Sequence, residues 1–288
     1  MNNKNIDVDF LTIKEFAESV GITAPSLRHY DNIGVFPSAK HGVEFENKYR
    51  YYSPMQITTV KMIRVLTEIG VPLKTIQELS QNRTPEKLLK LLIKHRNKIK
   101  EKIRFLQEII SVIGTFTELL NEAISVSETD ITVSEMPPKQ IILGDINDFS
   151  GNDSFYGAFL RFCKSAYEPK LNTSYPIGGY WDSMSAFLDK SSRPMRFFSL
   201  DPKGHEQKEA GLYLVGYTRG HYGQTNNLPN QMAAYAEKNG LIFTGPVYNI
   251  YLSDEISVAD PEQYLLQVSA SVRETRHATS YRPRHRFN

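Results

Sequence analysis

The sequence predicts an α+β fold built in three parts and followed by a short basic tail. Residues 1–82 read as short capped helices with one extended run, the pattern of an N-terminal winged helix-turn-helix. Residues 83–125 repeat apolar side chains at heptad spacing, which predicts one long dimerisation helix of a coiled coil. Residues 126–275 are rich in strand and aromatic patterns and predict an α+β domain with a duplicated order of elements. Residues 276–288 form the tail.

Composition limits the class of protein. The 288 residues carry 34 Lys and Arg against 32 Asp and Glu, so the net charge of +2 gives little indication of a nucleic-acid partner. Hydrophobic residues make up 40% of the chain, which is enough for a core. There is no run of about 18 apolar residues, and the N-terminus lacks an apolar signal region. We therefore expect a cytoplasmic protein without a membrane partner.

The cysteine and histidine content argues against disulfide and metal chemistry. Cys163 is the single cysteine, which excludes a disulfide within one chain and fits a reducing compartment. Seven histidines, at positions 29, 41, 95, 205, 221, 277 and 285, lack the spacing of a metal site. The sequence therefore predicts neither a metal ion nor a cofactor.

Two capped helices separated by a tight turn are expected near the start of the chain. Thr12 is followed three residues later by Glu15, the pattern of a capping box. Gly21 is expected to end the first helix, and Thr23 to cap the second. Pro25 falls in the first turn of that second helix, where a missing N–H does no harm. The pattern indicates a helix-turn-helix.

The second helix, in the stretch APSLRHYD, has Leu27 as its only large apolar residue. Ser26, Arg28, His29 and Tyr30 can bond phosphates or base edges, and an arginine can form a bidentate contact with guanine. The alternative is a plain helical hairpin with a solvated face. Charge does not decide between the two, because nine basic and nine acidic side chains balance in the predicted head.

A run of aromatic and basic residues, KYRYY, follows the second helix and predicts a strand or wing. Such a wing could follow the DNA backbone into an adjacent groove. The candidate DNA-contacting residues of the head are Thr12, Lys14, Thr23, Ser26, Arg28, His29, Tyr30, Lys48, Tyr49, Arg50, Tyr51 and Lys61.

The long helix carries a heptad seam. Its positions, in alternating steps of four and three, are Ile99, Ile103, Leu106, Ile110, Ile113, Thr117 and Leu120. An isolated helix would expose this seam, so a partner helix is required. The alternative is a long core helix within one globule. We favour a homodimer, because Lys and Arg fill the outer positions and few other helices could cover the seam.

Strands dominate the second half. Extended segments are expected in ITVSEMPPKQIILGDI, YPIGGYWDSM, MRFFSL, GLYLVGYTRGHYG, PVYNIYL and YLLQVSASV, and helices in DSFYGAFLRFCKSAY and LPNQMAAYAEKNG. The order extended, helix, strand, strand occurs twice, in residues 131–200 and 210–273, which indicates an internal duplication. Gly178 and Gly179 read as turn glycines.

The string LTIKEFAESVGITAPSLRHYDNIGVFPSAK, followed by NKYRYYSPMQITTVKMIRVLTEIGVPLKTIQEL, closely resembles the winged-helix head of the MerR family of transcription regulators. The resemblance implies promoter DNA and RNA polymerase holoenzyme as partners, and a dimer joined by an antiparallel coiled coil. It also implies that the dimer distorts the spacer between two promoter elements so that the polymerase engages both. His29 departs from the family, which usually has an aromatic such as tyrosine there.

The segments EMPPKQIILGDI, GLYLVGYTRGHYG and NGLIFTGPVYNIYLSDEISVADPEQYLLQVSASV look like the DNA-gyrase-inhibitor-like ligand-binding domain. Together the two halves are similar to BmrR-type multidrug-responsive activators. In such a domain several aromatic side chains should line a cavity for a flat hydrophobic aromatic ligand, neutral or cationic. The alternative for each is ordinary sheet core. The candidates are Tyr175, Tyr180, Trp181, Tyr213, Tyr222, Tyr248 and Asn249.

Asn249 stands where related pockets often carry a buried Glu that pairs with a cationic drug. An amide cannot neutralise a buried cation, although Asp182, Asp254 or Glu255 could take that role. We find no nucleophile–base pair, and Asn249 does not titrate, so we expect no enzyme activity. The predicted function is a ligand-responsive activator. The alternatives are a ligand-degrading hydrolase domain on a DNA-binding head, and a sensor of one specific metabolite.

Overall fold

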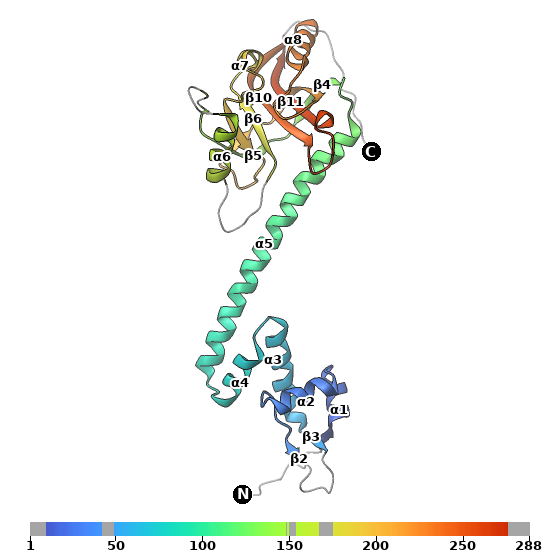
Figure 1. Ribbon diagram of the computed structural model, residues 1–288, viewed down its shortest axis with the longest axis vertical. Coiled ribbons are helices and arrows are strands. Elements are labelled where there is room, and N and C mark those ends of the chain that lie inside the picture. Colours follow the sequence, from blue (N-terminus) through green and yellow to red (C-terminus); the bar gives the residue numbers. More distant parts are fainter. Residues whose placement is uncertain (1–9, 42–48, 148, 150–153, 167–174, 276–288) are drawn as a thin grey trace. The chain divides into compact units, whose positions relative to one another are not determined.

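The computed structural model describes residues 10–41, 49–147, 149, 154–166 and 175–275 (Figure 1). By compactness the chain forms two units, Met1–Arg104 and Phe105–Asn288. This division cuts the long helix α5 (Pro85–Ser125), so the predicted boundaries after residues 82 and 125 stay predictions. Helices with a small sheet form the first unit, and a large sheet forms the second, which is the predicted α+β class.

The first unit consists of short helices and a three-stranded antiparallel sheet in the order β1-β3-β2. Its elements are β1 (Leu11–Thr12), α1 (Ile13–Val20), α2 (Ala24–Asn32), β2 (Lys40–His41), β3 (Arg50–Tyr52), a 3-10 turn (Pro54–Gln56), α3 (Ile57–Glu68) and α4 (Leu73–Gln81). The paired strands β2 and β3 form the wing. Lys48 lies outside the described residues.

Local capping fixes the first two helices as the sequence predicts. The Thr12 hydroxyl accepts a hydrogen bond from the Glu15 N–H at 3.3 Å, and the Glu15 carboxylate accepts one from the Thr12 N–H at 2.8 Å. Gly21 ends α1 with φ 67°, a left-handed conformation that suits glycine. Thr23 caps α2 and accepts from the Ser26 N–H at 3.2 Å. The predicted helix-turn-helix is confirmed.

Aromatic rings fill the core of the first unit. Phe16 and Tyr52 are fully buried and stack with their centroids 4.8 Å apart, and Phe36 stacks on Tyr52 at 5.7 Å. Leu27 is the buried residue of α2, as expected from the sequence. Arg28 and His29, by contrast, are exposed.

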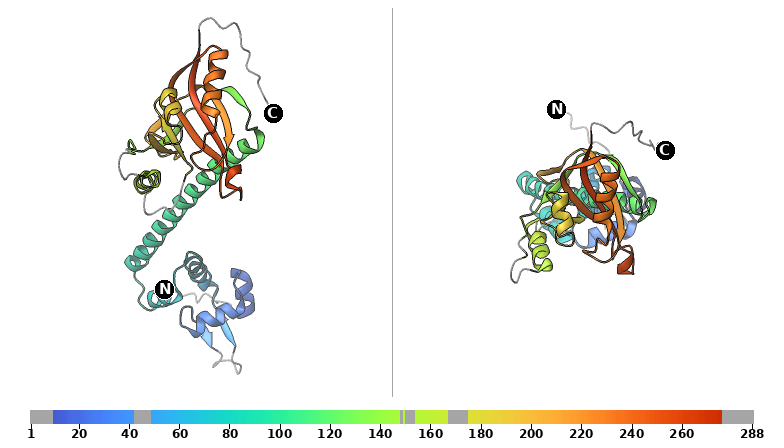
Figure 2. Two further views of the ribbon diagram at one scale, coloured as in Figure 1. Left: turned by 45° about the horizontal axis from the view of Figure 1, so that its top comes forward. Right: turned by 90° about the horizontal axis from the view of Figure 1, so that it is seen from above.

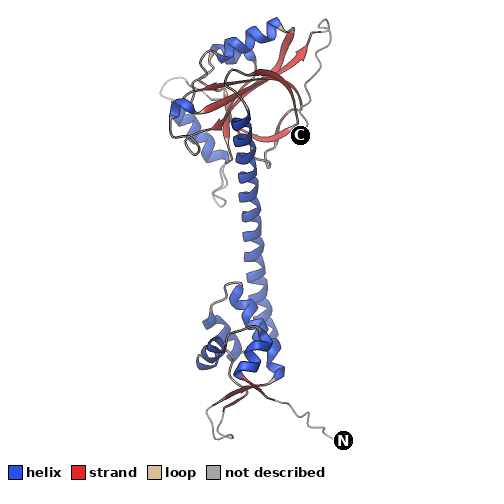
Figure 3. Cartoon of the chain, turned by 90° about the vertical axis from the view of Figure 1, so that its right-hand side faces the viewer, coloured by secondary structure: helices blue, strands red, loops and turns tan. Residues whose placement is uncertain are grey.

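Helix α5 is one unbroken helix of 41 residues (Figure 3). Along its predicted seam, Ile103, Ile110 and Ile113 are 49%, 68% and 59% exposed. Isoleucines at heptad spacing with such exposure are the side chains that a second helix would cover in a coiled coil. The long helix is confirmed, and its pairing with a second copy stays a prediction.

In its described part the second unit contains an eight-stranded antiparallel sheet in the order β4-β9-β11-β10-β6-β7-β5-β8. The strands are β4 (Ile131–Met136), β5 (Lys139–Leu143), β6 (Ile177–Trp181), β7 (Arg196–Ser199), β8 (Glu206–Lys208), β9 (Gly211–Arg219), β10 (Leu241–Ser253) and β11 (Leu265–Glu274). The helices are α6 (Phe155–Ala166), α7 (Met184–Asp189) and α8 (Leu228–Lys238).

The strand order supports the predicted duplication. One half of the sheet contains β9, β11 and β10, and the other half contains β5, β7 and β6. Within each set of three, the first strand along the chain lies farthest from the junction between the sets, the third lies in the middle and the second lies at the junction; β4 and β8 flank the two sets. A helix, α8 or α6, joins the first strand to the second in each half. The halves meet where β6 pairs with β10.

Different helices cover the two faces of this sheet. Helix α8 lies over one face (Figures 1 and 2), where Trp181 and Val247 are in a buried cluster with Met232 of α8. On the other face, Leu119 near the end of α5 is buried in a cluster with Tyr248. Because successive side chains of a strand point to opposite faces, strand position decides which residues can share a site.

Candidate functional site

Helix α2 carries a group of polar side chains. Arg28 and His29 are exposed, and Ser26 and Tyr30 are partly buried. The Ser26 hydroxyl lies 2.8 Å from that of Thr23, at the capped N-terminus of the helix. Backbone N–H groups and hydroxyls at a helix N-terminus attract phosphate oxygens. This part of α2 is chemically suited to the DNA backbone and, through Arg28, to base edges.

The wing strand β3 is tied to α2 by Arg50. Its Nη2 donates to the Asn32 side-chain oxygen at 2.9 Å, and its Nε is ion-paired with Asp31. Beside it, Tyr49 is 64% exposed. Burial, together with the negative charge of Asp31, raises the pKa of the neighbouring Tyr52 to about 12. The wing is therefore positioned by a buried ring and an ion pair, while Tyr49 remains accessible.

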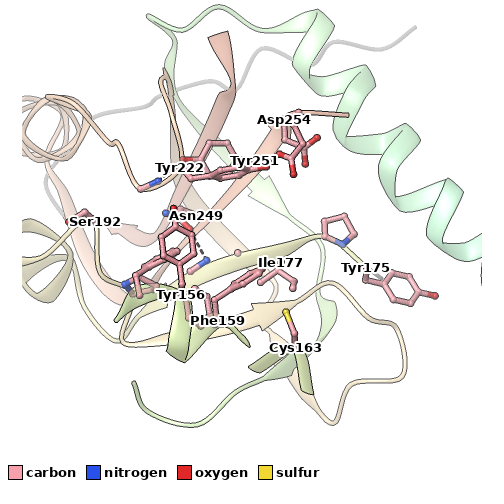
Figure 4. Close-up of a pocket in the computed structure, with 18 of the residues that line it drawn as sticks. Tyr156, Phe159, Cys163, Tyr175, Ile177, Ser192, Tyr222, Asn249, Tyr251 and Asp254 are labelled. Atoms are coloured by element: carbon pink, nitrogen blue, oxygen red, sulfur yellow. Dashed lines mark hydrogen bonds between the residues drawn. The ribbon is translucent and has the colours of Figure 1, made fainter. Parts of the chain in front are cut away.

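A pocket of about 500 Å³ lies in the second unit (Figure 4). Its aromatic lining consists of Phe116, Phe155, Tyr156, Phe159, Tyr175, Phe197, Tyr222 and Tyr251. The polar and acidic side chains are Ser191, Ser192, Asn249, Asp254 and Glu255. Among the described residues that line it there is no lysine, arginine or histidine. Its size and apolar walls suit a small aromatic molecule.

Helix α6 supplies one wall of the pocket. Phe155, Phe159 and Cys163 recur at steps of four residues, so they share one side of the helix. Phe155 and Phe159 both meet the Phe197 ring edge to face, at 5.4 and 5.5 Å. The packing on β7 therefore holds the aromatic wall in place. Burial raises the pKa of the Cys163 thiol, so this cysteine is not an activated thiolate.

The middle of the pocket is formed by β6 and β10. Gly179 pairs with Asn249 across the two strands, and its N–H donates to Oδ1 of Asn249 at 2.7 Å. A Cβ at residue 179 would lie 2.8 Å from that oxygen, and one at Gly178 would collide with the Asn249 carbonyl. The turn predicted at these glycines is wrong. They are strand residues that let a second strand approach closely.

Tyr222, Tyr251 and two carboxylates form another side of the pocket. The rings of Tyr222 and Tyr251 meet edge to face at 4.8 Å, and the Tyr222 hydroxyl donates to Glu255. Tyr251 accepts from the Gly223 N–H at 2.9 Å, and burial raises its pKa to about 12. Asp254, next in the chain to Glu255, also lines this side (Figure 4). The carboxylates give the pocket a negative side.

A separate polar cluster is buried on the α5 face of the sheet. Lys208 donates to the Ser269 hydroxyl at 2.7 Å, and its ammonium lies 4.7 and 4.9 Å from the Tyr213 and Tyr248 ring centroids. Burial lowers the pKa of Lys208 to about 8, despite the attraction of Glu122 on α5. No role was predicted for Lys208 from the sequence.

Two other kinds of site find no support in the described part of the chain. There, no group of three or more His, Cys, Asp and Glu side chains could hold a metal ion. Within the same residues, no helix is long and apolar enough to cross a membrane.

Comparison with known proteins assigns the head. Residues 11–83 match the family described as MerR HTH family regulatory protein. This head is a MerR-family domain. The multidrug-efflux transporter 2 regulator of Bacillus subtilis (strain 168) is 27% identical over 271 residues, which cover 92% of this chain and 97% of that protein. The transcriptional regulator BrlR of Pseudomonas aeruginosa is 36% identical over 104 residues, covering 35% of this chain and 38% of that protein.

A solved structure is also similar over most of the chain. It is the cryo-EM structure of an EcmrR–DNA complex in EcmrR-RPo, with 17% sequence identity and a TM-score of 0.38. The match covers 92% of this chain and 100% of that one.

The predicted DNA-contacting residues of the MerR-type head differ in exposure and in the hydrogen bonds that they already make within the head. Lys14 and Lys61 are exposed. The Thr12 hydroxyl is engaged in its capping box, and Tyr51 is partly buried. Arg50 uses two of its nitrogens within the head. Contact of any of them with DNA stays a prediction.

Three of the seven residues predicted for the ligand pocket line it. They are Tyr175, Tyr222 and Asn249. The other four do not line this pocket. They are Tyr180, Trp181, Tyr213 and Tyr248.

The positions of these four residues follow from strand geometry, in which successive side chains point to opposite faces of the sheet, and from packing against α7. Tyr180 and Tyr248 pair across β6 and β10 on the face opposite Asn249, and Tyr213 is buried on that same face. Trp181 is on the Asn249 face but packs beneath α7, where its ring meets Phe187 at 4.8 Å. Its Nε1 donates to the Lys190 carbonyl at 3.0 Å. Trp181, Tyr213 and Tyr248 are buried core residues, and Tyr180 is partly buried and packs against that core.

Most of the aromatic wall comes from residues that were not predicted to bind ligand. Phe155, Tyr156 and Phe159 belong to α6, which the sequence predicts as a helix but does not assign to the ligand site. Phe116 lies on α5, outside the segment predicted to bind ligand. Helices with aromatics on two adjacent faces, as at Phe155 and Tyr156, are the signal that could have indicated a pocket wall.

Proposed function

We propose that this chain is a ligand-responsive transcription activator. It binds promoter DNA through its MerR-type head and responds to a hydrophobic aromatic compound held in the second unit. The observation that carries the proposal is the aromatic pocket, in a chain whose head is a MerR-family domain. The match to a multidrug-efflux transporter regulator over nearly its whole length supports it.

The proposed mechanism acts on DNA geometry. A dimer joined through α5 binds the spacer of a promoter, and the liganded form distorts that spacer so that RNA polymerase holoenzyme engages both promoter elements. Phe116 belongs to α5 and also lines the pocket, so a ligand would touch this helix directly. A ligand that moves the Phe116 side chain could therefore shift the dimer, which is joined through α5, between its conformations.

The pocket chemistry supports binding over catalysis. A nucleophilic cysteine needs a lowered pKa, whereas burial raises that of Cys163. The side chains present can bind and orient an aromatic compound without reacting with it. We accordingly propose a non-enzymatic regulator that works in the cytoplasm, where promoter DNA and polymerase are found.

Alkylation of Cys163 tests the ligand half of this proposal. It is the only cysteine of the chain and lines the pocket, so its modification by iodoacetamide reports pocket access. We expect acridine orange, 9-fluorenone or both to slow the modification, measured by mass spectrometry of the full chain. As a control, Cys163→Ala with Ser127→Cys places the thiol outside the pocket lining, where the dyes should give no protection. Equal rates with and without every dye would contradict the proposal.

A further inference from the structure

We propose that the Asn249 amide selects ligands that carry a hydrogen-bond acceptor, such as a ketone oxygen, on a planar aromatic scaffold. The inference rests on the proposed function, because it specifies which ligands the pocket takes. It assigns Asn249 a role opposite to that of a carboxylate at the same place. A carboxylate would receive hydrogen bonds or pair with a cation, whereas this amide offers a donor.

The orientation of the amide follows from its neighbour. The Gly179 backbone N–H can only donate, and it donates to Oδ1 of Asn249 at 2.7 Å. Gly179 and Asn249 are directly paired in the register of β6 and β10, so the donor cannot move away while the sheet is intact. Oδ1 therefore faces β6, and Nδ2 is the group of the amide that remains to donate a hydrogen bond to a ligand.

Nδ2 has no hydrogen-bond partner within the described part of the chain. Aromatic side chains, glycines, Ser191 and Ser192 are among the residues that line the pocket, and Figure 4 shows Asn249 between Tyr156 and Phe159 below and Tyr222 and Tyr251 above. A donor that loses water on ligand binding and gains no partner is costly. An acceptor on the ligand removes that cost, so the pocket discriminates in favour of molecules that bring one.

A cationic group fits poorly at this point. An ammonium has only donors, so it could at most share Oδ1 with the Gly179 N–H and would leave Nδ2 without an acceptor. The carboxylates of Asp254 and Glu255 lie on another side of the pocket. A ligand amine would pair with these partly solvated carboxylates rather than with Asn249. The acceptor requirement at Asn249 is therefore independent of whether the ligand also carries an amine.

The shape of the pocket sets the scaffold. Rings from α6 and rings from the Tyr222 side flank the central amide (Figure 4). Planar aromatic molecules stack well between such walls. The ligand class assigned to this site is thus a planar aromatic ketone or a related carbonyl compound.

Two matched probes isolate the carbonyl. One is 2-[2-(dimethylamino)ethoxy]fluoren-9-one, and the other is the fluorene that lacks only the ketone. Both are planar and carry the same amine, so any contribution of Asp254 and Glu255 cancels. Isothermal titration with the full chain is expected to give about three- to tenfold tighter binding of the ketone, the worth of one hydrogen bond. Equal affinities for the two probes would overturn the proposal.

The variant Asn249→Asp completes the test. It keeps an oxygen for the Gly179 N–H and replaces the donor with a second acceptor, so the ketone should lose its advantage over the fluorene. Asn121→Asp, an exposed change of equal charge on α5, should keep the preference. If Asn249→Asp still preferred the ketone to the same extent, the amide would not be the selector. If neither probe bound the unmodified chain while Cys163 was also unprotected by every dye, the proposed ligand function itself would be contradicted.

Discussion

The Nε atom of Arg50, on the wing strand, lies 2.5 Å from Oδ2 of Asp31, on α2. The Asp31 side chain is 5% exposed, and its Oδ1 also accepts from the Ser38 N–H at 2.9 Å. One carboxylate therefore joins three segments: the end of α2, the chain that leaves it and the wing. The aspartate at the end of APSLRHYD is a structural anchor, placed directly after the polar residues of α2.

Removing this anchor should loosen the wing. Asp31→Ala leaves the Arg50 guanidinium and the Ser38 N–H without their acceptor, at a cost of about 1–3 kcal/mol. We expect faster hydrogen exchange in the peptide containing Ser38, measured by mass spectrometry on the full chain. Glu78→Ala, an exposed change on α4, serves as control and should leave that peptide unaffected. Unchanged exchange in Asp31→Ala would show that the wing is held by other contacts.

Arg28 is expected to carry much of the DNA affinity. Arg28→Ala should abolish binding to promoter fragments that the unmodified chain selects from random DNA, because it removes a bidentate contact worth about 1–3 kcal/mol together with a positive charge. The dimer should remain folded, since Arg28 is exposed. Lys74→Ala, which removes one charge on α4, should bind nearly normally in the same gel-shift assay. Specific binding that survives in Arg28→Ala would contradict our assignment of α2.

The exposed seam of α5 predicts how the chain associates. Ile110→Asp places a charge at a seam position that is 68% exposed in the single chain. Burying that charge between two helices is unfavourable, so sedimentation should show a shift from dimer to monomer. Lys102→Asp introduces the same residue outside the seam and should remain dimeric. A dimer in both variants would mean that another surface holds the copies together.

The buried Lys208 predicts a pH dependence of stability. Its pKa is about 8 in the fold and about 10.4 when unfolded, so between these values the unfolded chain binds more protons. The penalty of burying the charge is complete below pH 8 and is relieved as the pH rises toward 10.4. Lys208→Met should therefore melt at a higher temperature at pH 7, with an advantage that shrinks between pH 8 and 10.

A surface lysine provides the comparison for that prediction. Lys238→Met, at the end of α8, changes the same side chain without releasing a buried charge. Its melting temperature should stay near that of the unmodified chain at every pH. An advantage of Lys208→Met that persisted unchanged at pH 10 would be inconsistent with a lowered pKa.

The head was predictable because its signals are local. Thr12, Gly21 and Thr23 act on backbone groups within four residues, so their roles can be read directly from the sequence. The long helix was equally clear, since a heptad pattern needs no knowledge of the rest of the fold. The order of strands and helices also predicted the duplication that the sheet displays.

The pocket was less predictable because it depends on pairing between distant strands. Tyr248 and Asn249 are neighbours in sequence, but they point to opposite faces, and only the pairing of β10 with β6 decides which face holds the pocket. Trp181 lies on the same face as Asn249 but is buried beneath α7, a helix that was not predicted from the sequence. Residues on α5 and α6 enter the site only through tertiary packing.

Run-off transcription measures ligand-dependent activation itself. The template is a promoter fragment that the full chain binds, the enzyme is RNA polymerase holoenzyme, and the ligand is the dye that best protects Cys163. We expect this dye to raise transcript yield with the unmodified chain and to have no effect with Cys163→Trp, which is designed to fill the pocket. Equal yields with and without dye, or an equal rise in the filled variant, would contradict activation through this pocket.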